Sequence, residues 1–275
     1  MSAVSHETAT TAEATTTLHE ETPAHKAGPH ISLTADPIFH IGSFPVTNSL
    51  FLATIIMVLF VALATWLRGR FKLVPSMIQN VFEMFIEALL DLMDSVLGER
   101  RLSEKYMPIV ATIFLFVLFS NWFGLLPGVG SFIIGEHATP LLRAPSADLN
   151  FTLALAIISV ISANLFGIGA LGILKHASKF ISFKNPIAFF IGIIELVSEV
   201  AKMISFSFRL FGNVFAGEVL LAIIAFLAPY VLPIPFLGLE VFVGVIQALI
   251  FSMLTIVFIA ISIADHDDHA PEAAH

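Results

Sequence analysis

Five long apolar stretches dominate this sequence, and each is near or above the roughly 20 residues that an α-helix needs to cross a bilayer. They run over residues 48–67, 107–126, 149–174, 187–227 and 234–264. Hydrophobic residues make up 57% of the chain and charged residues 12%, and the charged share is about half the roughly 25% of a soluble protein. A water-soluble domain of 275 residues has too little interior to hide so much apolar surface. The sequence therefore predicts an all-α, polytopic integral membrane protein.

The basic residues predict how these spans are oriented. Nine of them follow the first and third stretches, namely Arg68, Arg70, Lys72, Arg100, Arg101, Lys105, Lys175, Lys179 and Lys184. Only Lys26 and Arg143 fall on the opposite side. Because short loops rich in Lys and Arg stay in the cytoplasm, we expect the N-terminus outside and the C-terminus in the cytoplasm. The translocated N-terminal tail, without a transit peptide, favours a bacterial plasma membrane over that of an organelle.

The two ends of the chain differ from the apolar part between them. Residues 1–34 are expected to be a disordered tail, because they are polar and lack the apolar run of a signal peptide. Residues 35–264 are expected to form a single transmembrane domain. Residues 265–275 form a second polar tail, in which His266 and His269 could hold a metal. So many acids at a chain end are more typical of a solvated tail, and a chain without Cys has no Cys-based metal site.

Residues 74–97 are predicted to form an amphipathic helix that does not cross the membrane. Four acids share one face of it at spacings of 4, 4 and 3, and these are Glu83, Glu87, Asp91 and Asp94. The helix is too polar to span the bilayer and too apolar to leave it, so we expect it at the cytoplasmic interface. A surface-lying connector is the favoured interpretation, and a docking face for a partner is the alternative.

The last two apolar stretches are too long for upright spans. Residues 187–227 contain no Pro, and an unbroken helix of that length reaches about 60 Å, twice the roughly 30 Å of the hydrocarbon core. This stretch therefore either turns back on itself or lies steeply inclined in the membrane. With residues 234–264 it predicts an inclined helical hairpin, joined by a Pro-containing turn at 229–235.

The same two stretches carry charges inside the predicted membrane region, namely Glu195, Glu199, Lys202, Arg209, Glu218 and Glu240. Each such charge costs from about 3 to over 10 kcal/mol and normally faces a cavity or a partner. Helical spacing places Glu195, Lys202 and Arg209 on one face, and Glu218 on the opposite face. No His lies in any of the five stretches, so proton handling within them must use carboxylates and Arg.

Arg209 is the charge that the chain itself explains least well. Glu195, Glu199 and Lys202 can neutralise one another at helical spacings, which is the structural alternative for those three. No acid lies three or four residues from Arg209, and a guanidinium cannot shed its charge as a buried Lys can. An uncompensated guanidinium in the membrane implies an acidic partner elsewhere, with another chain as the favoured place.

A family resemblance is carried by residues 205–221, which read SFSFRLFGNVFAGEVLL. This segment is similar to the signature of subunit a of the F-type ATP synthase, in which RLFGN surrounds the family's essential arginine. Further similar segments are SNWFGLLPG at 120–128 and PSADLNFT at 145–152. Gln247 falls where the family's last helix carries a Gln. The similarity covers roughly residues 35–264 and leaves out only the two tails.

The resemblance implies a non-catalytic stator subunit that couples ion flow to rotation of a c-ring, and thereby to ATP synthesis or hydrolysis. Two offset half-channels would carry protons to and from carboxylates on the ring. Arg209 would lie between the half-channels, displacing each proton by attracting the ionised carboxylate and blocking direct leakage. The long hairpin would lie beside the ring.

The resemblance also assigns the other polar residues of the two last stretches. These would be Glu218 and Glu240 in the outer half-channel, and Glu195, Ser205 and Asn213 beside the cytoplasmic one. Gln247 would face Arg209 across the hairpin. Many relatives pair a Glu with a His where this chain has Glu218 and Glu240. Two nearby carboxylates would titrate as a coupled pair, which leaves the choice between H⁺ and Na⁺ open.

The implied partners are the c-ring, the peripheral stalk subunit b, the remainder of the ATP synthase complex and the lipid bilayer. No cofactor and no nucleic acid are expected. A secondary transporter should show inverted repeats or paired broken helices, and the sequence has neither. A purely structural scaffold has no use for Arg209 in lipid. The chain also lacks the GxxxxGK[ST] phosphate loop, so nucleotide chemistry would belong to partner subunits.

Overall fold

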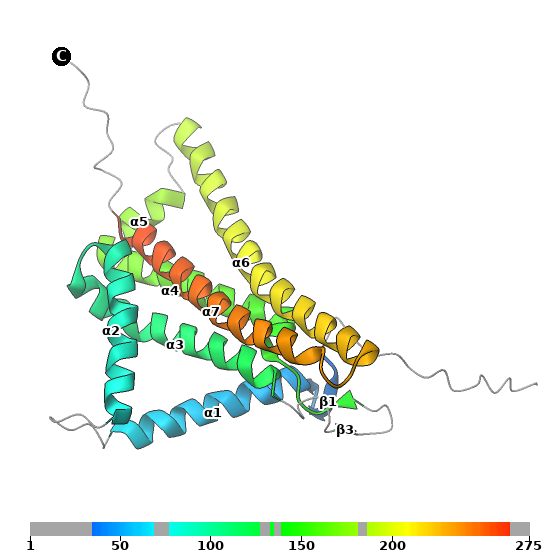
Figure 1. Ribbon diagram of the computed structural model, residues 1–275. Helices are drawn as coiled ribbons and strands as arrows, with labels where there is room; N and C mark the ends of the chain where they lie inside the picture. The colour runs from blue at the N-terminus through cyan, green and yellow to red at the C-terminus, as the bar shows by residue number, and fades with distance from the viewer. Residues whose placement is uncertain (1–34, 69–76, 127–132, 135–138, 181–185, 265–275) are drawn as a thin grey trace, which may run out of the picture. The chain divides into compact units, whose positions relative to one another are not determined.

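Figure 1 shows the computed structural model, which describes residues 35–68, 77–126, 133–134, 139–180 and 186–264. The expected tails 1–34 and 265–275 lie outside these residues, and with them the two candidate metal ligands of the C-terminal tail. Five helices of the described part are long and apolar enough to cross a membrane: α1 (Asn48–Arg68), α3 (Arg100–Gly124), α4 (Leu149–Leu171), α6 (Pro186–Leu227) and α7 (Pro233–Ile263). The predicted all-α membrane fold is confirmed.

Short elements connect these helices. Strand β1 (Pro37–Ile41) pairs antiparallel with β2 (Phe44–Thr47), and β3 (Ile133–Ile134) pairs with β4 (Thr139–Pro140). Gly42 in the β1–β2 turn has a φ of 63°, a conformation that glycine adopts without a steric penalty. A short 3₁₀ helix, Pro145–Ala147, leads into α4. Hydropathy alone does not predict these two hairpins, which are too short to produce a clear alternating pattern.

The third apolar stretch is divided into two helices. Asp148 caps the start of α4, because its side chain accepts a hydrogen bond of 3.0 Å from the backbone N–H of Asn150. Gly172, with a φ of 84°, ends α4, as glycine commonly does after the last turn of a helix. The short helix α5 (Ile173–Phe180) follows and packs against both α4 and α6.

The core lies where α3, α4, α6 and α7 meet. Its central contact is a stacked ring pair, in which the centroids of Phe206 on α6 and Phe251 on α7 lie 3.6 Å apart. Buried hydroxyls connect α4 to the same two helices. The hydroxyl oxygens of Thr152 on α4 and Ser207 on α6 are 3.0 Å apart. A second pair of hydroxyl oxygens, one on α4 and one on α7, is 2.8 Å apart. Such interhelical hydrogen bonds are typical of helices that pack within a membrane.

Helix α6 is one continuous helix of 42 residues, about 63 Å long at 1.5 Å per residue. The alternative in which this stretch turns back on itself is therefore wrong. Residues 228–232 join α6 to α7, and the two helices contact each other. They lie closest near this connection and separate toward their other ends (Figure 1). Their inclination to the membrane remains a prediction, one that the length of α6 favours.

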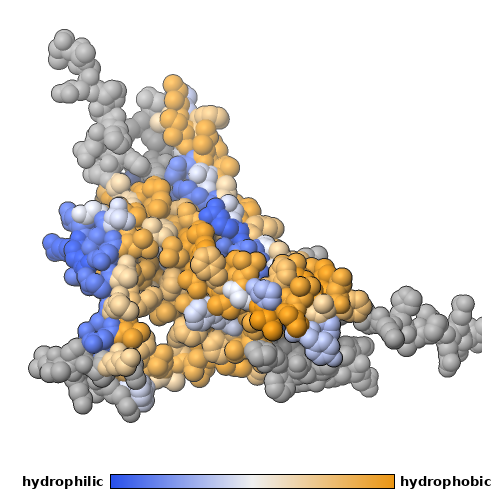
Figure 2. Space-filling view, viewed as in Figure 1, coloured by the Kyte–Doolittle hydropathy of each residue, from blue (hydrophilic) through white to orange (hydrophobic). Residues whose placement is uncertain are grey.

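Most of the four acidic side chains on the amphipathic helix form ion pairs within the chain. They lie on α2 (Met77–Leu97), and Arg100 at the start of α3 contacts three of them. Its guanidinium nitrogens lie 2.8 Å from Glu87, 3.2 Å from Asp91 and 2.9 Å from Asp94. The neighbouring Ser103 hydroxyl and Arg100 hold the pKa of Asp94 below its ordinary value. Figure 2 shows the hydrophilic residues gathered at this junction of α2 and α3. These contacts support the interpretation of α2 as a connector.

Candidate functional site

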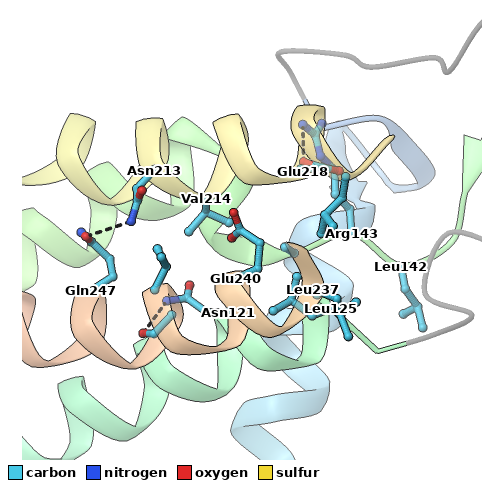
Figure 3. A pocket seen from close by; sticks show the side chains of 15 residues that line it. Asn121, Leu125, Leu142, Arg143, Asn213, Val214, Glu218, Leu237, Glu240 and Gln247 are labelled. Carbon is cyan, nitrogen blue, oxygen red and sulfur yellow. Dashed lines mark hydrogen bonds and ion pairs between the residues drawn. The ribbon is translucent and has the colours of Figure 1, made fainter. Parts of the chain in front are cut away.

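A cavity of about 250 Å³ lies between the ends of α6 and α7 that are nearest their connection. Helix α3 and residues 142–144 complete its wall. Its polar lining comes from Asn121, Arg143, Asn213, Glu218, Glu240 and Gln247. Figure 3 shows these side chains directed toward the same space, Arg143 from the segment before α4 and the others from helices. We call this space the glutamate cavity, because both glutamates near the α6–α7 connection line it.

Glu218 is paired with a basic residue that sequence analysis did not assign to the site. The guanidinium of Arg143 lies 3.4 Å from the Glu218 carboxylate, and the Arg143 side chain is only 5% exposed. A buried charge needs such a partner, because its removal from water is costly. One signal was available in the sequence, since Arg143 is one of the two basic residues on the side of the membrane expected to be poor in positive charge.

Glu240 reaches the glutamate cavity through a gap left by a glycine. Its carboxylate lies directly against Gly217 on α6, and a Cβ atom added to this glycine would overlap that carboxylate. Gly217 precedes Glu218 in the chain. The absence of a side chain at Gly217 therefore lets the second glutamate lie against the same turn of α6 that carries the first.

Gln247 and Asn213 connect α7 to α6 one turn beyond Arg209. The Asn213 amide donates a hydrogen bond of 3.3 Å to the Gln247 side-chain oxygen, and Gln247 is buried. Gln247 is expected to face Arg209, and Asn213 is expected beside Ser205 in the cytoplasmic half-channel. In the structure both line the glutamate cavity, and Asn213 lies about one helical turn beyond Arg209 on the same face of α6.

Arg209 lies in a separate groove of about 320 Å³, which we call the arginine groove. Lys202 and Ser205 line it from α6, together with Leu254 and Phe258 from α7. The Arg209 side chain is exposed. Within the described residues it forms neither a hydrogen bond nor an ion pair. Its guanidinium is therefore available to an acidic group of another molecule, as the sequence predicts.

Glu195, Glu199 and Lys202 form an ion cluster on the next two turns of α6. The Lys202 ammonium lies 2.9 Å from Glu199 and 3.9 Å from Glu195. The ion pairs that helical spacing predicts for these three residues are therefore present. It does not exclude a further role for Glu195, since two carboxylates share one ammonium.

Comparison with known proteins identifies the family. The family model described as ATP synthase A chain matches residues 48–260. This chain belongs to the ATP synthase subunit a family. ATP synthase subunit a of Campylobacter fetus is 35% identical over 237 residues, which cover 86% of this chain and 98% of the relative. The subunit from Moorella thermoacetica is 33% identical, with 83% and 96% covered, and one from Campylobacter jejuni is 36% identical, with 81% and 87% covered.

Membership of the subunit a family confirms the resemblance seen in residues 205–221. The chain is a multi-pass membrane protein and part of an ATP synthase complex. It is the non-catalytic, proton-translocating membrane subunit of that enzyme and acts in ATP synthesis and hydrogen ion transport.

The gap at Gly217 leads to a first prediction. Replacing Gly217 by Ala is expected to lower proton pumping several-fold without preventing assembly, because the new Cβ must displace the Glu240 carboxylate from the glutamate cavity. The measurement is ATP-driven proton uptake by inverted membrane vesicles. Gly169→Ala is the matched control, since a Cβ at Gly169 meets no atom within 4 Å. Equal pumping by the two variants would show that the position of Glu240 does not matter.

Proposed function

We propose that this chain is the stator subunit of an F-type ATP synthase in which Arg209 separates two offset proton half-channels. The observation that carries this proposal is the state of Arg209, an exposed guanidinium without an ion-pair partner in the described residues of a membrane-spanning helix. A permanent cation in such a position needs a carboxylate from outside the chain. Carboxylates carried past it by a rotating c-ring would meet that need in turn.

The outer half-channel of this proposal is the glutamate cavity. Glu218 and Glu240 are its proton carriers, and together they lie on the side of Arg209 nearest the α6–α7 connection. Arg143 holds Glu218 in place through their ion pair. Gln247 and Asn213 form the polar end of this cavity nearest Arg209. Two carboxylates can pass one proton between them, because only one needs to be ionised at a time.

The cytoplasmic half-channel leads from Arg209 in the other direction along α6. Ser205 lies beside Arg209 in the arginine groove, and Glu195 lies beyond Lys202. A proton that has left the ring would pass along these polar groups toward the cytoplasm. Arg209 prevents a direct passage between the two half-channels, since a fixed cation repels protons.

The proposal includes partners and a location. The exposed face of α6 around Arg209 would contact the c-ring, and the peripheral stalk subunit b would contact the chain elsewhere. We place the complex in a bacterial plasma membrane with the N-terminus outside, as the distribution of basic residues indicates. Residues 35–264 form the single membrane domain in this arrangement, between two polar tails.

Contact with the c-ring can be tested by disulfide cross-linking, because the chain has no Cys of its own. Gly212 lies on α6 one turn from Arg209, and nothing within 4 Å would obstruct a side chain there. Gly212→Cys is expected to cross-link under oxidation to ring subunits that carry a Cys one turn from their ion-binding carboxylate. Rotation, and with it ATP hydrolysis, would stop until a reductant is added.

Gly169→Cys on α4 serves as the control for this cross-link, because Gly169 is equally exposed and unobstructed. We expect no ring cross-link from it. Cross-linking from Gly169 but not from Gly212 would place the ring on a different face of the chain and contradict the proposal.

A further inference from the structure

A buried histidine lies beside the ion cluster of α6, although no His falls in a membrane-spanning helix of the described part. His176 belongs to α5, and its side chain is only 4% exposed. The His176 Nε2 lies 3.0 Å from the Asn164 side-chain oxygen on α4. The Asn164 side-chain nitrogen lies 3.5 Å from the Glu199 carboxylate on α6. Asn164 therefore connects the imidazole to the ion cluster.

The contacts of Asn164 determine how the imidazole is used. Its side-chain nitrogen donates to the Val160 carbonyl at 2.9 Å as well as to Glu199. The Asn164 oxygen must then be an acceptor, so His176 donates from Nε2–H. The imidazole therefore fixes the orientation of the Asn164 amide, whose nitrogen faces Glu199.

The surroundings of His176 fix the ring in this position. Gly167 on α4 leaves the necessary room, because a Cβ there would lie 2.7 Å from the ring and 2.6 Å from the backbone oxygen of Ser262 on α7. Asn164, His176 and Glu199 also line a common cavity of about 420 Å³, whose other lining side chains are apolar. The three polar groups are therefore held together in apolar surroundings.

The charges around His176 come from two elements. The cluster on α6 contributes Glu195, Glu199 and Lys202, and α5 contributes Lys175 among the side chains that the structure describes. Helix α4 and the described C-terminal half of α7 carry no charged residue. The cluster on α6 has a formal charge of −1, so one carboxylate can take up a proton while the other still pairs with Lys202.

We propose that Glu199 is a proton-exchanging carboxylate of the cytoplasmic half-channel, and that His176, acting through Asn164, is its positioning residue. The inference rests on the proposed function and extends its cytoplasmic half-channel beyond Glu195 and Ser205. During ATP hydrolysis, a proton from the cytoplasm would bind to the Glu199 carboxylate. It would then pass through water in the arginine groove, which Lys202 lines, to an ionised ring carboxylate. During synthesis the same proton would travel in reverse.

The test uses the whole complex in inverted vesicles, where the medium replaces the cytoplasm. Initial rates of ATP-driven proton uptake are measured for each variant under the same conditions. Glu199→Gln is expected to lower the rate about 10-fold or more, because a proton-transfer group of similar shape is lost. Glu104→Gln, at an exposed site on α3, is the control and should pump at the native rate.

His176→Gln and His176→Ala together separate positioning from a merely structural role. The Gln amide can still donate to Asn164, so His176→Gln is expected to pump close to the native rate, whereas His176→Ala loses this donor and should pump as slowly as Glu199→Gln. Asn164→Ala breaks the connection without removing a charge and should slow pumping in the same way. His40→Gln, on the exposed side of β1, is the control. An equal loss for His176→Gln and His176→Ala would show that a donor at this position is not what matters and would overturn the inference.

Failure of this inference can be distinguished from failure of the proposed function. Arg209→Ala is measured in the same vesicles. Native pumping by Glu199→Gln together with no pumping by Arg209→Ala would overturn only the role of Glu199. Native pumping by Arg209→Ala would overturn the proposed function itself. Bound ATPase activity shows in each case that the complex has assembled, and the rate of Asn164→Ala decides the question if the Glu199 variant does not assemble.

Discussion

Replacing Arg209 by Ala is expected to abolish ATP-driven proton uptake by inverted vesicles while the complex remains assembled. The side chain has no ion-pair partner in the described residues, so its loss breaks no contact that stabilises this part of the chain. The variant removes the cation that attracts each ionised ring carboxylate and that blocks leakage between the half-channels. Coupling should therefore fail without a loss of stability, which is unusual for a charge in a membrane helix.

Two further variants sharpen this experiment. Arg209→Lys keeps a positive charge but is also expected to pump poorly, since an ammonium can lose its proton in apolar surroundings whereas a guanidinium does not. Arg101→Ala removes an exposed basic residue at the start of α3 and should pump normally. Near-native pumping by Arg209→Ala, with the ATPase head still bound, would contradict the proposed function. The charges of α6 would then be structural pairs only.

Removal of both carboxylates from the glutamate cavity is expected to have the second-largest effect. Glu218→Gln or Glu240→Gln alone should lower proton uptake several-fold, because the remaining carboxylate still lines the same cavity. The double variant should lose about 100-fold or more, the loss typical of removing an acid–base group from a proton path. The single and double variants thus test whether the two residues act on one path.

The interpretation of these variants depends on Arg143. Glu218→Gln removes the carboxylate that the buried Arg143 guanidinium contacts, and the loss of an ion-pair partner from a buried charge destabilises the fold. Arg143→Gln combined with Glu218→Gln removes both charges, so it separates instability from loss of the proton carrier. If this double variant assembles but does not pump protons, the Glu218 carboxylate itself is required. A double Glu218→Gln, Glu240→Gln variant that pumps normally would show that protons take another route.

The parts of the fold that depend on local sequence could be predicted. Apolar length predicts the five spans, and the absence of Pro from 187–227 predicts the long α6. Helical spacing predicts the pairing of Glu195 and Glu199 with Lys202, and the lack of nearby acids predicts an unpaired Arg209. Each of these features arises within one helix, where the period of 3.6 residues relates sequence to space directly.

Contacts between helices could not be predicted from the spacing of residues within one helix. The Arg143–Glu218 pair joins a loop to α6 across 75 positions of the chain, and His176 meets Asn164 only because Gly172 lets α5 fold back. Periodicity does not specify which helix faces which, or at what depth.

The sequence by itself therefore determined the membrane class, the spans, the family and the isolated charge of Arg209. Only the tertiary structure decided that both glutamates share one cavity, that Gln247 bonds to Asn213, and that His176 is connected to the ion cluster of α6 through Asn164. The physical reason is that apolar helices of similar length can pack in many ways in a membrane. Close approaches, such as that of Glu240 to Gly217, select one of them.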